Sequence, residues 1–283
     1  MKKSYNIIIL ILFFTPLITA FLMYGIGEFP VESPTSKTEF KIMTYNIHFG
    51  QGYDDKLNLE RIAQNILTED PDILGLQEVD NGRITTQGID MALWLSNRLG
   101  MHYFYFPSEN EHQGGCALLS KYPIKSTVGY LIPSISSQRV LIHGVVEISS
   151  SLNLDIFVTH LGLINWSEDM TAQVDFVLSK TNAVISGNPK ILMGDFNLEN
   201  DTVQIQTIRT FLSDTMDGFS KGNTFPSFVG LYDIPEESID YIFGTGYSSV
   251  INSYVVRDFI PGINLPEEFG SDHLPVVTVL TYS

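Results

Sequence analysis

Several strand-like runs of this 283-residue sequence carry, at one end, a polar side chain that can bind a metal ion or a phosphate group. These side chains are Asn46, Glu78, His160, Asp195, Asn197, Asp240, Asp272 and His273. Strand ends are the places where a rigid sheet presents the residues of a site. The pattern therefore predicts that distant strand ends converge into one site with carboxylate, amide and imidazole groups.

Each carboxylate motif has a chemical and a structural interpretation. Glu78 closes the apolar run LGLQEVD, where its charge needs water, an ion-pair partner or a cation. Asp195 and Asn197 are two residues apart in ILMGDFNL, so an extended backbone places both side chains on the same side. An acceptor beside a donor suits a phosphate group with an attacking water, and the alternative for this pair is an Asx turn.

The histidine in SDHLPV indicates proton transfer. Neighbouring residues on an extended chain point in opposite directions, so Asp240 is a better candidate partner for His273 than Asp272. An imidazole oriented by a carboxylate is the usual general base near neutral pH, and a structural histidine is the alternative. Arg139 begins another strand-like run, where it can hold a phosphate oxygen or serve as a surface cation.

The first part of the chain has the composition of a membrane segment. Lys2 and Lys3 precede an uncharged run, residues 7–26, which has the length of about 20 residues that spans a bilayer. The charges at its ends predict that the body lies outside the cytoplasm. A long apolar run without a clear cleavage site favours an uncleaved anchor for residues 1–27, with a cleaved signal peptide or a buried helix as alternatives.

Residues 28–38 contain Pro30 and Pro34 and are predicted to be a linker, followed by one body over residues 39–283. Apolar spacing predicts helices over 59–67 and 89–99 and another that starts near 167. Strands are predicted at 40–47, 73–76, 102–106, 116–120, 127–132, 140–148, 152–159, 190–193, 239–243, 250–257 and 275–281. This mixture indicates an α/β fold with two sheets at its centre and helices outside.

The charge of the chain argues against nucleic acid as the preferred partner. The formal net charge is −16, and without Lys2 and Lys3 the part after the apolar run carries 14 − 32 = −18. Binding to duplex DNA usually needs basic residues that neutralise phosphates. The single cysteine, Cys116, excludes an intrachain disulfide and a cysteine-rich zinc site.

Taken together, the motifs resemble the endonuclease/exonuclease/phosphatase superfamily, whose fold is that of DNase I. The resemblance is carried, in order along the chain, by MTYNIH, ILGLQEVD, ALLSKYPI, VTHLG, MGDFNL, IDYIFG and SDHLPV. The stretch from NLERIAQ to YFYFP is similar to secreted or membrane-linked members and to the C-terminal domain of the yeast Cwh43 protein. The resemblance implies a four-layer α/β/β/α sandwich for residues 39–283, with the site at one end.

The resemblance also implies a divalent metal ion. Glu78 would be its principal ligand, with Asn46 nearby and Asp272 as a further ligand or as a residue that orients the site. Carboxylate and amide oxygens are hard ligands, which suit Mg²⁺ or Mn²⁺.

The remaining roles follow from the same resemblance. His273 would be the general base, held by Asp240, and Asp195 would position the attacking water. Asn197 would bind the phosphate, and His160 would stabilise charge at phosphorus or assist the leaving group. Arg139 stands where relatives often have a substrate-binding arginine. Cys116 replaces an asparagine found in many relatives, so one substrate contact would be lost.

These inferences predict a monomeric metal-dependent phosphoester hydrolase that acts outside the cytoplasm, anchored in the membrane or, alternatively, secreted. The anchor favours a lipid or membrane-linked phosphodiester as substrate. The alternatives are an extracellular nuclease, which the acidic charge disfavours, and a phosphatase of soluble phosphoesters. An alternative from another class is a non-catalytic binding protein on the same fold. Loss of one or more site residues would mark such a protein, and every candidate site residue is present.

Overall fold

The computed structural model describes residues 14–15, 37–108, 114–163, 169–220, 222–226, 237–257 and 269–282. The chain divides into two units, Met1–Val31 and Glu32–Ser283, and the second contains all the sheets. Apart from Phe14 and Thr15, the predicted anchor or signal segment lies outside the described residues. Among the residues that are described, no helix is both long and apolar enough to span a bilayer.

The first sheet has six strands around a central parallel pair. Its order is β11 (Ser249–Val255), β12 (Val276–Thr281), β1 (Glu39–Asn46), β2 (Ile73–Val79), β4 (Gly115–Ser120) and β3 (His102–Phe106). Strands β1 and β2 are parallel, while the other neighbours are antiparallel. The parallel pair therefore ends at one edge, which brings the ends of the Asn46 and Glu78 runs together.

The second sheet repeats this plan. Its order is β5 (Ile124–Ile132), β6 (Arg139–Glu147), β7 (Asn153–His160), β8 (Lys190–Asp195), β10 (Asp240–Thr245) and β9 (Ser213–Asp214). Strands β7 and β8 are the parallel pair. Strand β10 runs antiparallel to β8, so that it begins where β8 ends.

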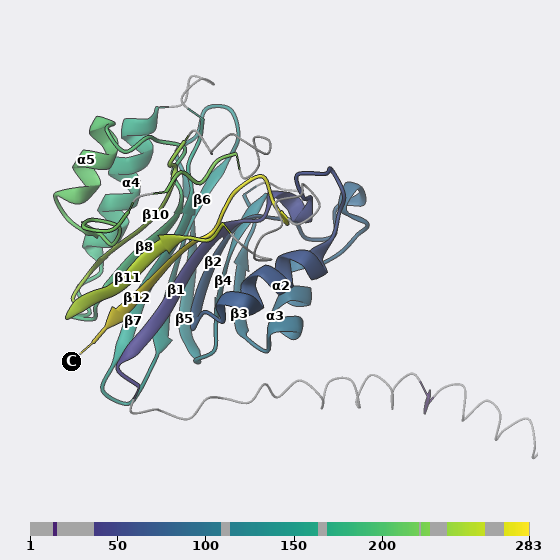
Figure 1. Ribbon diagram of the computed structural model, residues 1–283, viewed down its shortest axis with the longest axis horizontal. Helices are drawn as coiled ribbons and strands as arrows, with labels where there is room; N and C mark the ends of the chain where they lie inside the picture. Colours follow the sequence, from purple (N-terminus) through teal and green to yellow (C-terminus); the bar gives the residue numbers. More distant parts are fainter. Residues whose placement is uncertain are drawn as a thin grey trace, which may run out of the picture. The chain divides into compact units, whose positions relative to one another are not determined.

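The two sheets pack face to face, and helices cover their outer faces, as Figure 1 shows. Helices α2 (Leu59–Glu69) and α3 (Met91–Leu99) cover the first sheet, and α4 (Met170–Ala183) and α5 (Val203–Arg209) cover the second. Three helices begin at an Asn or Asp whose side chain accepts a hydrogen bond from the first turn: Asn58, Asp90 and Asp169. The predicted four-layer α/β/β/α architecture is confirmed.

Alternation along the central strands divides the core into layers. Ile42 of β1, Val158 of β7 and Met193 of β8 lie between the sheets, whereas Phe157 and Leu192 face the helices of the second sheet. The same alternation places Asn46 four positions after Ile42, His160 two after Val158 and Asp195 two after Met193, each at the end of its strand. The sequence pattern that builds the inner core thus also directs these polar side chains inward.

The predicted helices and strands are all present within a few residues. Helix α5, the short strand β9 and the 3-10 turns η1 (His48–Gly50) and η2 (Ile84–Thr86) were not predicted. Each is short, so apolar periodicity gives little signal. The predicted start near 167 lies outside the described residues, and α4 begins after Asp169, which accepts from the Ala172 N–H.

Candidate active site

Three of the predicted site residues are neighbours across the second sheet. His160 pairs with Asp195 between β7 and β8, and Asp240 pairs with Asp195 between β10 and β8. All three belong to the buried polar residues of the chain. The parallel and antiparallel registers together therefore place an imidazole and two carboxylates side by side at one edge of the sheet.

Glu78 reaches the same site through an irregularity in β2. The register between β2 and β4 shifts between Leu76 and Val79, and Glu78 has a left-handed backbone with φ 55°. A non-glycine residue in this region costs free energy and is often found at functional sites. Without the bulge, Glu78 would share the outer face of Leu74 and Leu76, so the bulge is what turns its carboxylate toward the inner site.

The amide of Asn46 connects the two sheets. Its Nδ2 donates to Asp195 Oδ2 at 2.9 Å and to Glu78 Oε1 at 3.1 Å, and it lies 3.4 Å from His273 Nε2. Its Oδ1 accepts the backbone N–H of His48 at 3.0 Å. Both polar atoms are engaged by protein groups, so the amide is oriented as a donor to carboxylates and its oxygen is not turned toward the cavity.

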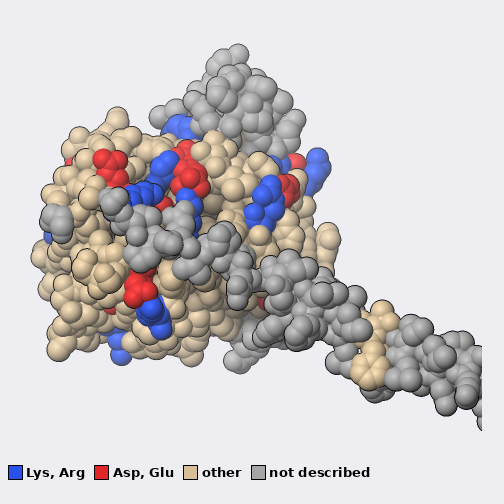
Figure 2. Space-filling model, turned by 90° about the horizontal axis from the view of Figure 1, so that it is seen from below, with Lys and Arg blue, Asp and Glu red and all other residues tan. Residues whose placement is uncertain are grey.

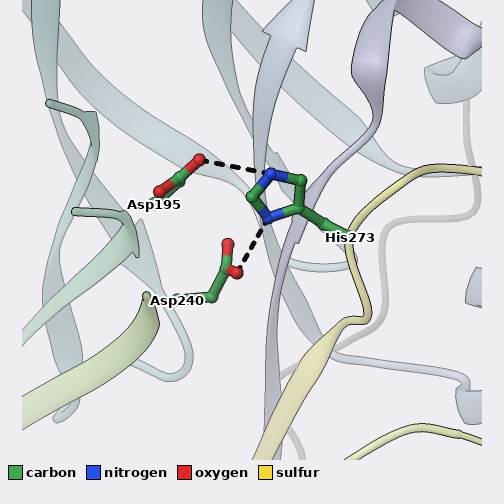
Figure 3. Close-up of side chains that lie close together, drawn as sticks. All are labelled: Asp195, Asp240 and His273. Atoms are coloured by element: carbon green, nitrogen blue, oxygen red, sulfur yellow. Dashed lines mark hydrogen bonds and ion pairs between the residues drawn. The ribbon is translucent and has the colours of Figure 1, made fainter. Parts of the chain in front are cut away.

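His273 lies between two aspartates that come from different strands, as Figure 3 shows. Its Nδ1 is 2.9 Å from Asp240 Oδ2, and its Nε2 is 3.6 Å from Asp195 Oδ2. Burial lowers the pKa of His273, but the charges of Asp240 and Asp195 outweigh it and raise the pKa to about 10. The imidazole is therefore protonated in the absence of a cation.

The pKa values of two carboxylates in the site are raised as well, which means that their charged forms are disfavoured. Burial and the neighbouring Asp240 raise the pKa of Asp195 to about 7. Burial also raises the pKa of Glu78, which the charge of His273 partly opposes. Asp272 adds a further acid, 3.6 Å from His48 Nδ1. The site thus contains more carboxylates than the cations that face them can balance.

Two positions in this acidic site are candidates for a cation. Asp195, Asp240 and His273 each place one ligand atom so that all lie within 4.8 Å of one another. However, the His273 Nδ1 is hydrogen-bonded to Asp240, which leaves this group arranged as a proton-transfer chain. Glu78 and Asp272 line the cavity, and among the described residues only Asn46 donates a hydrogen bond to the Glu78 carboxylate.

His160, Arg139 and Asn197 form the other side of the site. Arg139 Nη1 lies 3.0 Å from His160 Nε2, and Asn197 Nδ2 lies 3.2 Å from the same nitrogen. Burial and the charge of Arg139 lower the pKa of His160 well below its usual value, so its imidazole is neutral. The Asn197 N–H donates to Asp195 Oδ1 at 2.9 Å, which is the Asx turn considered as an alternative. Asp195 and Asn197 therefore form an Asx turn and also line the cavity.

These side chains surround an open cavity of about 420 Å³. The predicted residues that line it are Glu78, Arg139, His160, Asp195, Asn197, Asp272 and His273, while Asn46 and Asp240 are buried residues that contact this set. Sequence reasoning missed Phe49, Arg83, Ser108, Ser137, Gln138 and Phe225, which also line the cavity. These residues come from connecting segments, where no periodicity marks a side chain as facing a site.

Cys116 does not contact the cavity. Its side chain is fully buried between the sheets with Leu118, because both lie on the inner face of β4, and it is not among the residues that line the cavity. Burial raises the pKa of the Cys116 thiol. Of the other histidines, His48 lines the cavity, whereas His143 Nε2 lies 2.7 Å from Asp155 Oδ1 and does not line it. His112 and Trp166 lie outside the described residues.

Comparisons with known proteins agree with this geometry. A model of the endonuclease/exonuclease/phosphatase family matches residues 43–273, which include every candidate residue named above from Asn46 to His273. The protein cwh43 of Schizosaccharomyces pombe is 32% identical over 119 residues. That match covers 42% of this chain and 12% of the yeast protein, so the chain corresponds to a small part of that relative's length.

Solved structures share the fold at low sequence identity. A family member from Bacteroides thetaiotaomicron is 19% identical with a TM-score of 0.71, over 87% of this chain and 98% of that one. A mannosyl-6-phosphatase from the same species is 19% identical, with a TM-score of 0.69 over 86% and 100% of the two chains. A truncated Caenorhabditis elegans TDP2 is 21% identical, with a TM-score of 0.67 over 86% and 97%.

Proposed function

Because the chain belongs to the endonuclease/exonuclease/phosphatase family, we propose that it is a metal-dependent phosphoester hydrolase that uses the cavity described above. The observation that carries the proposal is the convergence of Glu78, Asp195 and His273, which are far apart in sequence, around one cavity.

The residues at the site fit a hard divalent cation. Glu78, Asp195 and Asp240 are carboxylates at one edge of the core, and the raised pKa of Glu78 and of Asp195 reflects charge that the protein does not balance. Oxygen ligands suit Mg²⁺ or Mn²⁺. We assign the cation to Glu78 and Asp272, and we assign Asn46 to holding Glu78 and Asp195 in place. When bound, such a cation neutralises a phosphate oxygen.

The chain's own groups supply the proton transfer and the binding of phosphate. Asp240 fixes the imidazole through Nδ1, which leaves Nε2 of His273 to take a proton from water. Neutralisation of the neighbouring carboxylates lowers the pKa of His273 from about 10 toward the range in which it acts as a base. Asp195 accepts from that water and orients it.

Arg139 and Asn197 hold the phosphate. The Arg139 side chain lines the cavity, where its Nη1 also contacts His160. A guanidinium carries several N–H donors in a planar fork, which suits the oxygens of a phosphate group. Neutral His160, which Arg139 and Asn197 both contact, stabilises charge on the phosphoryl group through a hydrogen bond.

The direct test is hydrolysis of bis-p-nitrophenyl phosphate by the purified body with Mg²⁺, with Mn²⁺ and with EDTA. We expect release of p-nitrophenol with either metal and none with EDTA. Exchange of His102, which is not among the cavity residues, for Ala is a matched control that retains activity. Absence of metal-dependent hydrolysis of every phosphoester tested would instead support the non-catalytic alternative.

For the substrate class we propose a lipid or membrane-linked phosphodiester. Ile84 is 94% exposed next to Arg83, which lines the cavity, and Leu131 is exposed near the end of β5, close in sequence to Ser137 and Gln138 of the opposite side. Exposed apolar side chains that are close in sequence to cavity residues suit a substrate with an acyl chain. On the face drawn in Figure 2, the described basic and acidic side chains lie interspersed, which does not favour a long polyanion.

The predicted location follows from the N-terminal segment. We propose that residues 1–27 anchor a monomer whose hydrolase domain lies outside the cytoplasm, with secretion after cleavage as the alternative. Mass spectrometry of the native N-terminus decides between the two. Activity profiling against sphingomyelin, phosphoinositides, plasmid DNA and nucleotides, at matched Mg²⁺ and salt, tests the substrate class. A preference for DNA would overturn the lipid proposal.

A further inference from the structure

A second arginine, Arg83, lines the same cavity as Arg139. It lies in the segment between β2 and α3, and none of the roles assigned above uses it. We infer that Arg83, supported by Phe49 and Asp80, forms a second anion subsite, which binds a phosphoryl group of the substrate other than the one that is hydrolysed. This inference rests on the proposed function and specifies the substrate class further.

The backbone holds Arg83 in place. Its carbonyl oxygen accepts the N–H groups of Gly88 at 2.8 Å and of Thr86 at 3.2 Å. The same segment is closed by an isolated bridge between Asn81 and Asp90. An arginine fixed in this way loses less conformational freedom on binding than one on a free surface loop.

The side chain is fixed from two directions. The Arg83 guanidinium lies over the ring of Phe49, with 5.7 Å from Cζ to the ring centroid. Phe49 itself is held in a left-handed backbone with φ 52° and also lines the cavity. Stacking on an aromatic face orients a guanidinium without using its N–H donors.

The second support is the fully buried carboxylate of Asp80. Its Oδ1 accepts the Gly114 N–H at 3.0 Å, whereas its Oδ2 accepts no hydrogen bond among the described residues. Arg83 Nη1 lies 3.6 Å from this Oδ2, which is too far for a hydrogen bond but close enough for charge attraction. The guanidinium is thus held near Asp80 while its N–H donors remain available to a ligand.

The charges of the cavity indicate what binds there. Glu78, Asp195 and Asp272 make its floor acidic, so an anion is bound near the metal or at an arginine. A guanidinium binds phosphate through paired hydrogen bonds better than it binds a neutral group. Because Arg139 contacts His160, the hydrolysed phosphoryl group is assigned to Arg139, and Arg83 is left for a second phosphoryl group.

The test uses ligands that cannot be hydrolysed. Binding of α,ω-alkanebisphosphonates of increasing chain length is compared with that of alkylmonophosphonates of matched length by titration calorimetry in Mg²⁺. For wild type we expect one chain length to bind about tenfold more tightly as the bisphosphonate. In Arg83→Gln we expect this ratio to fall to about one, with monophosphonate binding unchanged. Arg98→Gln, which removes an exposed arginine paired with Glu60, is the matched control.

Two further variants keep the result interpretable. Arg83→Lys retains the charge but loses the planar stacking on Phe49, so it gives an intermediate ratio. Asp80→Asn with Arg83→Gln removes the buried charge that Arg83→Gln alone would leave, and thermal unfolding shows that the variants are folded. A wild-type ratio near one at every length, or an unchanged ratio in Arg83→Gln, would overturn the subsite. A normal ratio without any hydrolysis would retain the subsite and refute the proposed activity.

Discussion

Two His–Asp pairs involve buried aspartates of the second sheet, and they differ in whether the protein stabilises the carboxylate charge. His143 of β6 and Asp155 of β7 lie 2.7 Å apart, and Asp155 also accepts from Ser186. Burial raises the pKa of Asp155, but the hydrogen bonds from His143 and Ser186 outweigh it and lower the pKa below its usual value. At the active site, His273 faces Asp240 and Asp195 together, and the pKa of Asp195 is raised.

The difference shows how one chemical pair serves stability in one place and catalysis in another. One carboxylate that accepts from an imidazole and a hydroxyl has its charge satisfied by the protein. Several carboxylates around one imidazole do not have their charges satisfied in this way. Their burial costs free energy of folding, and a bound cation removes that cost. A single histidine beside an aspartate is therefore not diagnostic, whereas a surplus of buried acid beside a cavity is.

The sharpest test of this contrast exchanges each histidine for alanine. In His273→Ala we expect hydrolysis of bis-p-nitrophenyl phosphate to fall by on the order of 10²–10⁴, because the general base is lost. In His143→Ala we expect activity within about twofold of wild type. Steady-state kinetics measures both, and circular dichroism shows that both are folded. Equal activity in the two variants would remove the distinction.

The acids at the active site and Asp155 should differ in how their removal changes the free energy of unfolding. With EDTA, Glu78→Gln should be more stable than wild type by about 1 kcal/mol, because an unfavourable buried charge is gone. Asp155→Asn should be less stable by about 1–3 kcal/mol, because the amide nitrogen cannot accept from Ser186. Urea unfolding with and without Mg²⁺ measures this.

The same titrations locate the cation. Wild type and Asp155→Asn should both gain stability from Mg²⁺, and Glu78→Gln should gain little. If Asp240→Asn instead abolished the gain and Glu78→Gln kept it, the cation would belong to the group of Asp195, Asp240 and His273.

The fold and the floor of the site were predictable because one pattern specifies both. Alternation in β1, β7 and β8 assigns residues to the inner core, and the same alternation ends in Asn46, His160 and Asp195. The motif order then identified Glu78 and His273. What alternation did not predict is the bulge at Glu78, which depends on pairing between β2 and β4.

The rim of the cavity was beyond sequence reasoning for a related reason. Phe49, Arg83, Gln138 and Phe225 come from segments without periodicity, and they meet only because the strands before them end at one edge. Nothing in the sequence distinguished Arg83 from a surface arginine until its contact with Phe49 was known. The groups proposed to perform the chemistry were thus more predictable than those proposed to select the substrate.

Exchange of Asp240 should change the pH dependence of activity. The base must be deprotonated, so activity rises as pH passes the pKa of His273 in the metal-bound enzyme. Asp240 is one of the charges that raise this pKa, so Asp240→Asn should move the rise to lower pH by on the order of one unit. The maximal rate should also fall, because the imidazole is less well oriented. A profile of kcat against pH measures both, and a rise displaced to higher pH would contradict the assignment.

The smallest expected effect is the pH dependence that Asp155 contributes to stability. Its folded-state pKa lies below the unfolded value, so its contribution is present above the unfolded value, near 4, and is lost as pH falls through the folded pKa. The stability difference between wild type and Asp155→Asn should therefore shrink below about pH 4.

For Asp195 in EDTA the pH dependence of stability has the opposite sign. Its folded-state pKa is raised to about 7, so its ionisation costs stability as pH rises from about 4 to 7. Urea unfolding of both wild type and variants across this range measures the two slopes. Opposite slopes are what a satisfied pair and an unsatisfied cluster require, and parallel slopes would mean that the two acids are balanced by the protein in the same way.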